Sequence, residues 1–169
     1  MNNHLKEILL KLSVNNVKYV VCGGVALVLH GVERLTMDID ISVSMDRENI
    51  KLLLRVLKEL GMVPRVPVSA ESLLDPVKRK IMTEKKNAIV FTFIDVNNPY
   101  RQVDIFLGKD GMYEELVKDA VTVEISAIKI PVISIQTLIM MKKKVKPPRD
   151  KDISDIKELL KITGNYNEG

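Results

Sequence analysis

The stretch that most constrains the fold of this chain joins two short strands through a glycine pair. The run Lys18–Cys22 is largely apolar, as is typical of a buried strand, and Gly23 and Gly24 follow it directly. An apolar helix is predicted next, over residues 25–30, and a second strand over residues 38–43. A strand, a tight glycine turn and a buried helix before the next strand indicate a domain built around a sheet.

Two aspartates lie two residues apart in the second strand. Side chains alternate along a strand, so Asp38 and Asp40 point to one face, with Cα atoms roughly 6–7 Å apart. Ile39 and Ile41 then point to the other face, into a core. Two neighbouring carboxylates at the end of an apolar strand are costly unless a cation lies between them. Hard carboxylate oxygens favour Mg²⁺ or Mn²⁺, so the pair predicts a divalent metal site.

A third aspartate, Asp104, lies among apolar neighbours in a strand predicted over Arg101–Leu107. If this strand lies beside residues 38–43, Asp104 joins the aspartate pair in a cluster of three carboxylates. Such a cluster can hold one or two divalent cations and suits phosphoryl transfer, with Asp104 able to accept the proton of an attacking hydroxyl.

The glycine pair adds a place for phosphates. Backbone N–H groups at a Gly-Gly turn can approach a polyphosphate closely, and the dipole of the following helix favours negative charge there. A glycine pair alone is a weak signal. Gly23-Gly24 followed by an Asp-x-Asp strand is a much stronger signal. The glycine amides can bind phosphate groups, and the aspartates can bind the metal ion that those phosphates require.

The segment from Gly23 to Asp40, with its motifs G-G-x-A, H-G and R-x-T-x-D-I-D, resembles the polymerase-β-like nucleotidyltransferase superfamily. In particular it is similar to small prokaryotic members related to the toxin nucleotidyltransferases of abortive-infection systems. The segment from Arg149 to Asp155 also resembles the R-x-K-D-x-x-D segment that those proteins carry on a C-terminal helix.

This resemblance implies an enzyme that transfers a nucleoside monophosphate from a triphosphate to an acceptor and releases pyrophosphate, with Mg²⁺ or Mn²⁺ as cofactor. Asp38, Asp40 and Asp104 correspond to its catalytic and metal-binding residues, and Gly23 and Gly24 to its triphosphate-binding turn. Many members have Gly-Ser at this turn, so Gly24 removes a hydroxyl and leaves the backbone amides.

Three more residues complete the predicted nucleotide-binding set. Arg34 binds the triphosphate or the acceptor, or else anchors its loop to a carboxylate. Thr36, just before the acidic strand, is expected to hydrogen-bond to the metal-binding residues. Lys144 belongs to a basic run, Lys142–Lys144 with Arg149 beyond it, which either faces the phosphates or forms a solvated helix end.

Simpler structural roles stay open for several residues. Asp38 and Asp40 could be solvated residues at a strand end, and Asp104 could pair with Arg101 or Arg34 across the sheet. For other residues we expect a structural role. His30 is expected to cap carbonyls or make a core hydrogen bond, and Cys22 to be a small core side chain. Asp152 and Asp155 are expected to form a local salt-bridge network with Lys151 and the lysine run.

The remaining pattern predicts a mixed α/β (α+β) fold, with one mixed sheet and helices packed mainly on one side. A single domain over residues 1–169 is expected, with the C-terminal helices of 134–162 packed on the core and a flexible tail from 164. Residues 62–87 are the least legible, with a short helix expected near 70–82. The other expected helices cover 3–13, 47–60, 113–118, 134–144 and 151–162, and the other expected strands cover 88–95, 121–125 and 128–132.

Composition excludes several other functions. With 46% hydrophobic and 28% charged residues, the chain belongs with globular proteins, and one cysteine excludes an internal disulfide or a cysteine zinc site. No apolar run reaches membrane-spanning length and no leader precedes the first helix, so a cytoplasmic location without a membrane partner is expected. A formal charge of +4 suits a phosphate ligand.

Three classes of acceptor are open: a small molecule, a tRNA and a protein. Two alternatives to the enzyme are open as well. One is a nucleotide-binding module that has lost the chemistry, and the other is a toxin held in check by an antitoxin partner.

Overall fold

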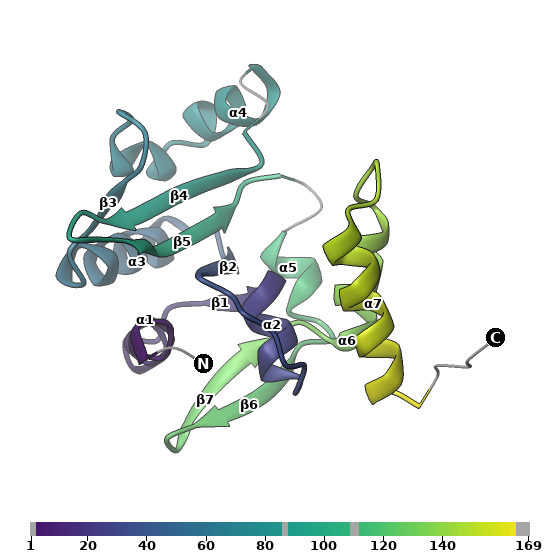
Figure 1. The fold of residues 1–169 in the computed structure, drawn as a ribbon. Helices are drawn as coiled ribbons and strands as arrows, with labels where there is room; N and C mark the ends of the chain where they lie inside the picture. The colour runs from purple at the N-terminus through teal and green to yellow at the C-terminus, as the bar shows by residue number, and fades with distance from the viewer. Residues whose placement is uncertain (1–2, 86–87, 109–111, 165–169) are drawn as a thin grey trace.

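The computed structural model describes residues 3–85, 88–108 and 112–164, and within them the strands form one seven-stranded sheet (Figure 1). The order across the sheet is β3-β4-β5-β2-β1-β7-β6. β2 is parallel to β5 and β1 is parallel to β7, whereas the other neighbours are antiparallel, so the expected mixed sheet is confirmed. The strands are β1 (Tyr19–Cys22), β2 (Asp38–Val43), β3 (Met62–Pro64), β4 (Val90–Asp95), β5 (Asn98–Phe106), β6 (Val121–Ile125) and β7 (Ile128–Val132).

Seven α-helices and one 3₁₀-helix, η1, accompany the sheet in the described residues. Most begin and end within a few residues of the predicted bounds. They are α1 (Asn3–Val14), α2 (Gly23–Leu29), α3 (Arg47–Glu59), η1 (Ala70–Leu74), α4 (Pro76–Lys85), α5 (Tyr113–Leu116), α6 (Ile135–Lys143) and α7 (Asp150–Ile162). None of these helices is long and apolar enough to cross a membrane.

Residues 62–85 are more regular than the sequence suggested. Three residues form the edge strand β3, which is too short to show a period and ends at Pro64. The single helix expected near 70–82 is two elements, η1 and α4. Pro76 opens α4, where a missing N–H costs nothing, and the carboxylate of Asp75 accepts a hydrogen bond from the Val77 amide at 2.8 Å.

Two elements, α2 and β5, begin earlier in the chain than the sequence predicted. α2 begins at Gly23 itself, two residues before the predicted start, and β5 begins at Asn98, which shortens the turn after β4. Ser134 caps the start of α6, since its hydroxyl accepts a hydrogen bond from the Thr137 amide at 3.1 Å. Asp46 occupies the N-cap position of α3, but its side chain makes no capping hydrogen bond.

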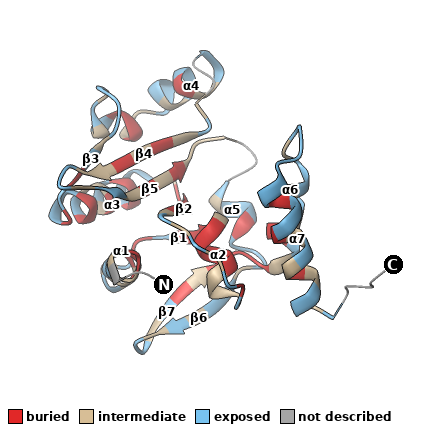
Figure 2. Cartoon of the chain, in the orientation of Figure 1, coloured by how far each residue is buried: buried red, intermediate tan, exposed pale blue. Residues whose placement is uncertain are grey.

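One face of the sheet is covered by α1, and this leaves the other face of β2 for the aspartates. The Tyr19 hydroxyl donates to the Leu9 carbonyl in α1 at 3.1 Å, so α1 lies on the Tyr19 side of β1. In the register of β1 and β2, Tyr19 is opposite Val43, and Cys22 is opposite Asp40. Since side chains alternate, Asp40 points away from α1. Figure 2 shows the buried centre at β1 and α2 and the exposed outer sides of α6 and α7.

Candidate active site

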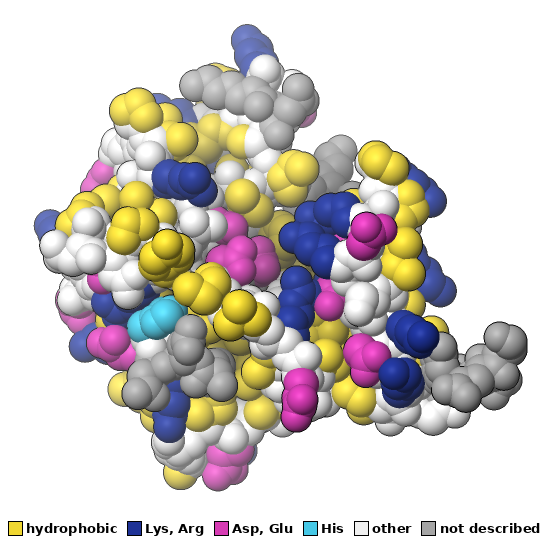
Figure 3. Space-filling model, in the orientation of Figure 1, with side chains coloured by type: hydrophobic (Ala, Val, Ile, Leu, Met, Phe, Trp, Pro, Cys, Tyr) yellow, Lys and Arg dark blue, Asp and Glu magenta, His cyan; other side chains and the backbone are white. Residues whose placement is uncertain are grey.

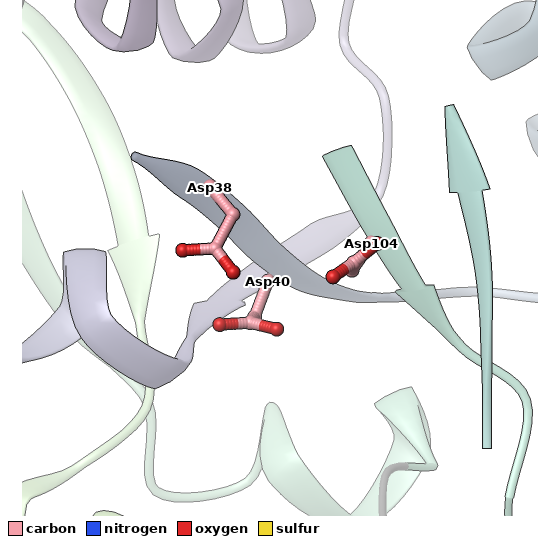
Figure 4. Close-up of side chains that lie close together, drawn as sticks. All are labelled: Asp38, Asp40 and Asp104. Atoms are coloured by element: carbon pink, nitrogen blue, oxygen red, sulfur yellow. The ribbon is translucent and has the colours of Figure 1, made fainter. Parts of the chain in front are cut away.

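Pairing of β2 with β5 brings three aspartates together. Asp40 lies directly opposite Asp104 in this parallel pair, and Asp38 lies two residues earlier on the same face. Each of the three offers a carboxylate oxygen, and these oxygens all lie within 4.8 Å of one another. Figure 4 shows the three side chains projecting from the two strands into one space. The strand adjacency on which the predicted cluster of three carboxylates depended is present, and we call Asp38, Asp40 and Asp104 the acidic triad.

Asp40 lies in the middle of the triad, where burial and the two neighbouring carboxylates both act on it. Burial of its carboxyl, then the charges of Asp38 and Asp104, raise its pKa to about 6. A backbone hydrogen bond from Gly24 and the positive charge of Lys142 act in the opposite direction. Three crowded carboxylates supply the hard oxygen donors that Mg²⁺ and Mn²⁺ prefer, and a divalent cation would relieve their repulsion. The residues present therefore fit such an ion.

Hydrogen bonds hold the outer members of the triad in place. The Thr92 hydroxyl donates to Asp104 Oδ1 at 2.6 Å, and the Gln102 amide donates to Asp104 Oδ2 at 3.0 Å. The Thr36 hydroxyl donates weakly to Asp38 Oδ1, at 3.3 Å. In this structure Asp104 is thus oriented by neutral groups, and the alternative in which it pairs with an arginine is wrong.

The two arginines proposed for that pairing have other carboxylate partners. Arg101 bonds to Asp95 at the end of β4, at 3.0 Å, and to Glu7 on α1, at 2.8 Å. Arg34 pairs with Asp155 on α7. Of the two roles left open for Arg34, anchoring its loop to a carboxylate is the one that the structure has.

Each glycine of the pair lacks room for a side chain, for a different reason. Gly23 has a φ of +58°, and a Cβ there would lie 1.8 Å from Asp40 Oδ2. At Gly24 the backbone is unstrained, but a Cβ would lie 2.6 Å from the Thr36 hydroxyl oxygen. The hydroxyl of Thr36 therefore occupies the space into which a serine at position 24 would extend, which explains the departure from Gly-Ser in spatial terms.

A buried network of charges lies between α6, α7 and the loop before β2. Asp152 and Asp155 are only 1% and 6% exposed, respectively. Lys142 contacts them at 3.1 and 2.6 Å, and Arg149 contacts Asp152 at 2.5 Å. With Arg34 on Asp155, these five residues form what we call the ion network. Burial would raise the pKa of Asp152, but hydrogen bonds from Arg149 and Lys142 hold it below its usual value.

The ion network differs in its basic partners from the salt-bridge network that the sequence predicted. A salt-bridge network around Asp152 and Asp155 was expected, but its partners in this structure are Lys142, Arg149 and Arg34 rather than Lys151. Lys142 is four residues after the buried Leu138, so it lies on the inward face of α6. That spacing is the sequence signal that could have singled out Lys142 within the lysine run.

Beside the triad lies a cleft of about 490 Å³, which we call the cationic cleft. Gly23 and Asp40 lie on its wall, and its basic side chains are Lys142, Lys144 and Arg149. Its other lining residues are mostly apolar: Ile89, Phe106, Leu138, Met141, Val145 and the buried Asp152. Figure 3 shows acidic side chains at the centre of this face and basic ones toward α6 and α7. Lys144, predicted to bind nucleotide, thus lines the cleft from an exposed position.

The structural roles expected for two other residues are confirmed. A ring nitrogen of His30 lies 2.8 Å from the Ile133 carbonyl, so this histidine makes a hydrogen bond to the backbone of a neighbouring segment. Cys22 is fully buried in the hydrophobic core, and burial raises the pKa of its thiol well above its usual value. It is therefore a core side chain.

Comparison with known proteins places this geometry in context. The family model of aminoglycoside-2''-adenylyltransferase matches residues 4–159. Among solved structures, lincomycin-bound LnuA, a lincosamide antibiotic adenylyltransferase, is 21% identical, with a TM-score of 0.63 over 96% of this chain and 98% of its own. ANT(2'')-Ia in complex with adenylyl-2''-tobramycin is 15% identical, with a TM-score of 0.60 over 95% and 87%. A nucleotidyltransferase structure from Thermotoga maritima is 21% identical, with a TM-score of 0.54 over 96% and 91%. No curated protein sequence matches the chain.

Proposed function

The chain belongs to the aminoglycoside-2''-adenylyltransferase family, and from this premise we propose that it transfers a nucleoside monophosphate from a triphosphate to a hydroxyl of a small-molecule acceptor. Family membership confirms the expected nucleotidyltransferase superfamily. The observation that carries the proposal is the convergence of three carboxylates beside a cleft with basic side chains. LnuA and ANT(2'')-Ia, the similar structures bound to lincomycin and an adenylylated tobramycin, favour a small acceptor.

In this proposal Asp38, Asp40 and Asp104 hold Mg²⁺ or Mn²⁺. The ion, when bound, supplies positive charge that neutralises phosphate oxygens and favours ionisation of the acceptor hydroxyl. The triphosphate lies in the cationic cleft, where Lys142 and Arg149 offset its negative charge. The missing side chain at Gly23 lets the phosphates approach the backbone closely.

The chemical step is an in-line displacement at the α-phosphorus. The acceptor oxygen forms a bond to this phosphorus while the bond to the bridging oxygen of the pyrophosphate breaks, and pyrophosphate leaves with the electron pair. The proton of the acceptor hydroxyl passes to the Asp104 carboxylate. Thr92 and Gln102 hold that carboxylate in place, one hydrogen bond on each oxygen.

Replacing Asp104 tests this assignment with a change that keeps the shape of the side chain. We expect Asp104→Asn to lower the rate of nucleotidyl transfer by about 100-fold or more, because the base and one metal donor are lost together. Asp46→Asn is the matched control, since the side chain of Asp46 is 69% exposed on the surface. Normal pyrophosphate release by Asp104→Asn would refute the proposed mechanism.

The alternative of a nucleotide-binding module without chemistry is tested by the same preparation. Binding of Mg·ATP measured by calorimetry, with no acceptor-dependent release of pyrophosphate across many acceptors, would favour the module. The intact triad argues for the enzyme. A toxin role with an antitoxin partner stays a prediction of the sequence resemblance, and growth arrest on expression that an Asp40→Ala variant relieves would support it.

A further inference from the structure

A second cleft, of about 330 Å³, lies at the other end of the acidic triad. It reaches the triad at Asp38, whereas the cationic cleft reaches it at Asp40. Asp38 lies opposite Gln102 in the register of β2 and β5, and both residues line this second cleft. The two clefts therefore adjoin different members of the triad, as a donor site and an acceptor site would. The other lining residues are Arg34, Leu35, Thr36, Met37, Pro99 and Tyr100.

Large apolar side chains are exposed in this cleft. Leu35 is 82% exposed, Tyr100 is 69% exposed and Met37 is 36% exposed. Single exposed apolar residues are normal on a protein surface, but several that converge beside a reactive centre indicate a binding surface. Leu35 and Met37 come from the loop before β2, and Tyr100 comes from β5. The lining thus presents an apolar patch to any molecule that approaches the triad from this side.

Charge in the same cleft is sparse. Among the residues that the structure describes, Asp38 is the single acidic residue that lines it, and Asp38 belongs to the triad. Arg34 is the single basic lining residue in the described part of the chain, and its guanidinium is paired with Asp155. The cationic cleft is lined by three basic and two acidic side chains. Of the two acidic residues, Asp152 is paired with Lys142 and Arg149, and Asp40 belongs to the triad that would hold the metal ion. A polycation requires several carboxylates around it, because each desolvated ammonium group needs a partner.

We propose that the acceptor is a hydroxyl-bearing small molecule with an apolar surface and little positive charge, and not a polycationic aminoglycoside. This assignment rests on the proposed nucleotidyl transfer and adds the substrate class. The apolar part of the acceptor covers Leu35, Met37 and Tyr100, which directs one hydroxyl toward Asp38 and Asp104. The chain thereby departs from the acceptor class in the name of its family.

Two antibiotics of different charge provide the test. Lincomycin carries several hydroxyls, one basic amine and an alkyl chain, whereas tobramycin carries several ammonium groups at neutral pH. We expect lincomycin to raise pyrophosphate release from Mg·ATP above the acceptor-free rate and to become labelled by α-labelled ATP. We expect no comparable effect of tobramycin.

The possible outcomes separate the acceptor assignment from the proposed function. Labelling of tobramycin as fast as lincomycin would overturn the acceptor assignment and leave nucleotidyl transfer standing. Binding of Mg·ATP without any rise in pyrophosphate release for lincomycin would also overturn the assignment. Failure of the protein to bind Mg·ATP at all would refute the proposed function, and the acceptor assignment with it.

A charge placed in the cleft gives a second measurement. Leu35→Glu should raise the KM for lincomycin about tenfold, because an apolar contact is lost, and should increase the affinity for tobramycin measured by calorimetry. Val14→Glu is the matched control, since Val14 is an exposed apolar residue on α1, 63% exposed and outside the cleft. Equal KM values for Leu35→Glu and Val14→Glu would contradict the placement of the acceptor.

Discussion

The contact between Gly24 and Thr36 makes a sharp prediction about the missing serine. A side chain at position 24 would place its Cβ 2.6 Å from the Thr36 hydroxyl oxygen and 3.2 Å from Thr36 Cβ. Gly24→Ser therefore forces the two side chains together and should lower the free energy of unfolding by about 1–3 kcal/mol, the usual cost of overpacking. The φ of Gly24 lies outside the left-handed region, so the cost is steric and not a backbone strain.

A purely steric cost can be removed by shortening the neighbour. Thr36→Ala deletes the oxygen at 2.6 Å and leaves the Cβ at 3.2 Å as the one close contact, which a shift of a few tenths of an ångström relieves. We expect the double variant Gly24→Ser, Thr36→Ala to recover at least about 1 kcal/mol relative to the sum of the single variants. The serine hydroxyl would then lie close to where the threonine hydroxyl was.

Urea denaturation of the wild type, both single variants and the double variant measures this coupling. Costs that add to within about 0.5 kcal/mol would refute the idea that Thr36 excludes a side chain at position 24. Gly23→Ala is the matched comparison, since its Cβ would meet Asp40 and its φ is +58°. Thr36→Ala should not rescue Gly23→Ala. If the hydroxyl at this place contacts a phosphate, the double variant should also transfer nucleotide faster than Thr36→Ala alone.

Three further predictions concern charge. The pKa of Asp40 is about 6 in the folded chain against 3.8 ordinarily, so the metal-free protein loses up to about 3 kcal/mol of stability as the pH rises through that range. In the presence of a chelator, Asp40→Asn should therefore be more stable than the wild type at pH ~7.5 but not near pH ~4. Urea denaturation at both pH values measures this, and an equal gain at both would contradict it. Asp155→Ala leaves Arg34 and Lys142 short of a buried carboxylate and should cost about 3–5 kcal/mol of unfolding free energy by urea denaturation, whereas a cost below about 1 kcal/mol would show that the network contributes little. Lys142→Ala should weaken Mg·ATP binding in calorimetry more than Lys144→Ala does, because the charge of Lys142 acts on Asp40. The reverse order would contradict this and would indicate that the phosphates bind further out in the cleft, near Lys144.

Local signals in the sequence predicted six of the seven strands and the face on which Asp38 and Asp40 lie. The alternation of aspartate and isoleucine in β2 fixed the face of Asp38 and Asp40, and burial of Ile39 and Ile41 agrees with it. Asp104 was recognisable because one carboxylate in an apolar strand is costly without a partner. The triad also requires that β2 pairs with β5, which no local signal in the sequence indicates.

Contacts between distant segments were not predictable in the same way. Arg34 and Asp155 are 121 residues apart, and no spacing rule links a loop to a helix at that separation. The cleft that contains Leu35 and Tyr100 depends in the same way on which strands are neighbours. The edge strand β3 was missed because three residues carry too little periodicity.

The ion network changes how the charge of the active site should be counted. The triad carries three negative charges when ionised, and the network, with three basic and two acidic side chains, carries one positive charge. The remaining two negative charges equal the charge of one divalent cation. The two buried aspartates of α7 hold Lys142 and Arg149, whose positive charges act on Asp40. Removing one of these aspartates would therefore leave an excess of positive charge beside the triad, which weakens the attraction for a metal ion while strengthening that for a triphosphate.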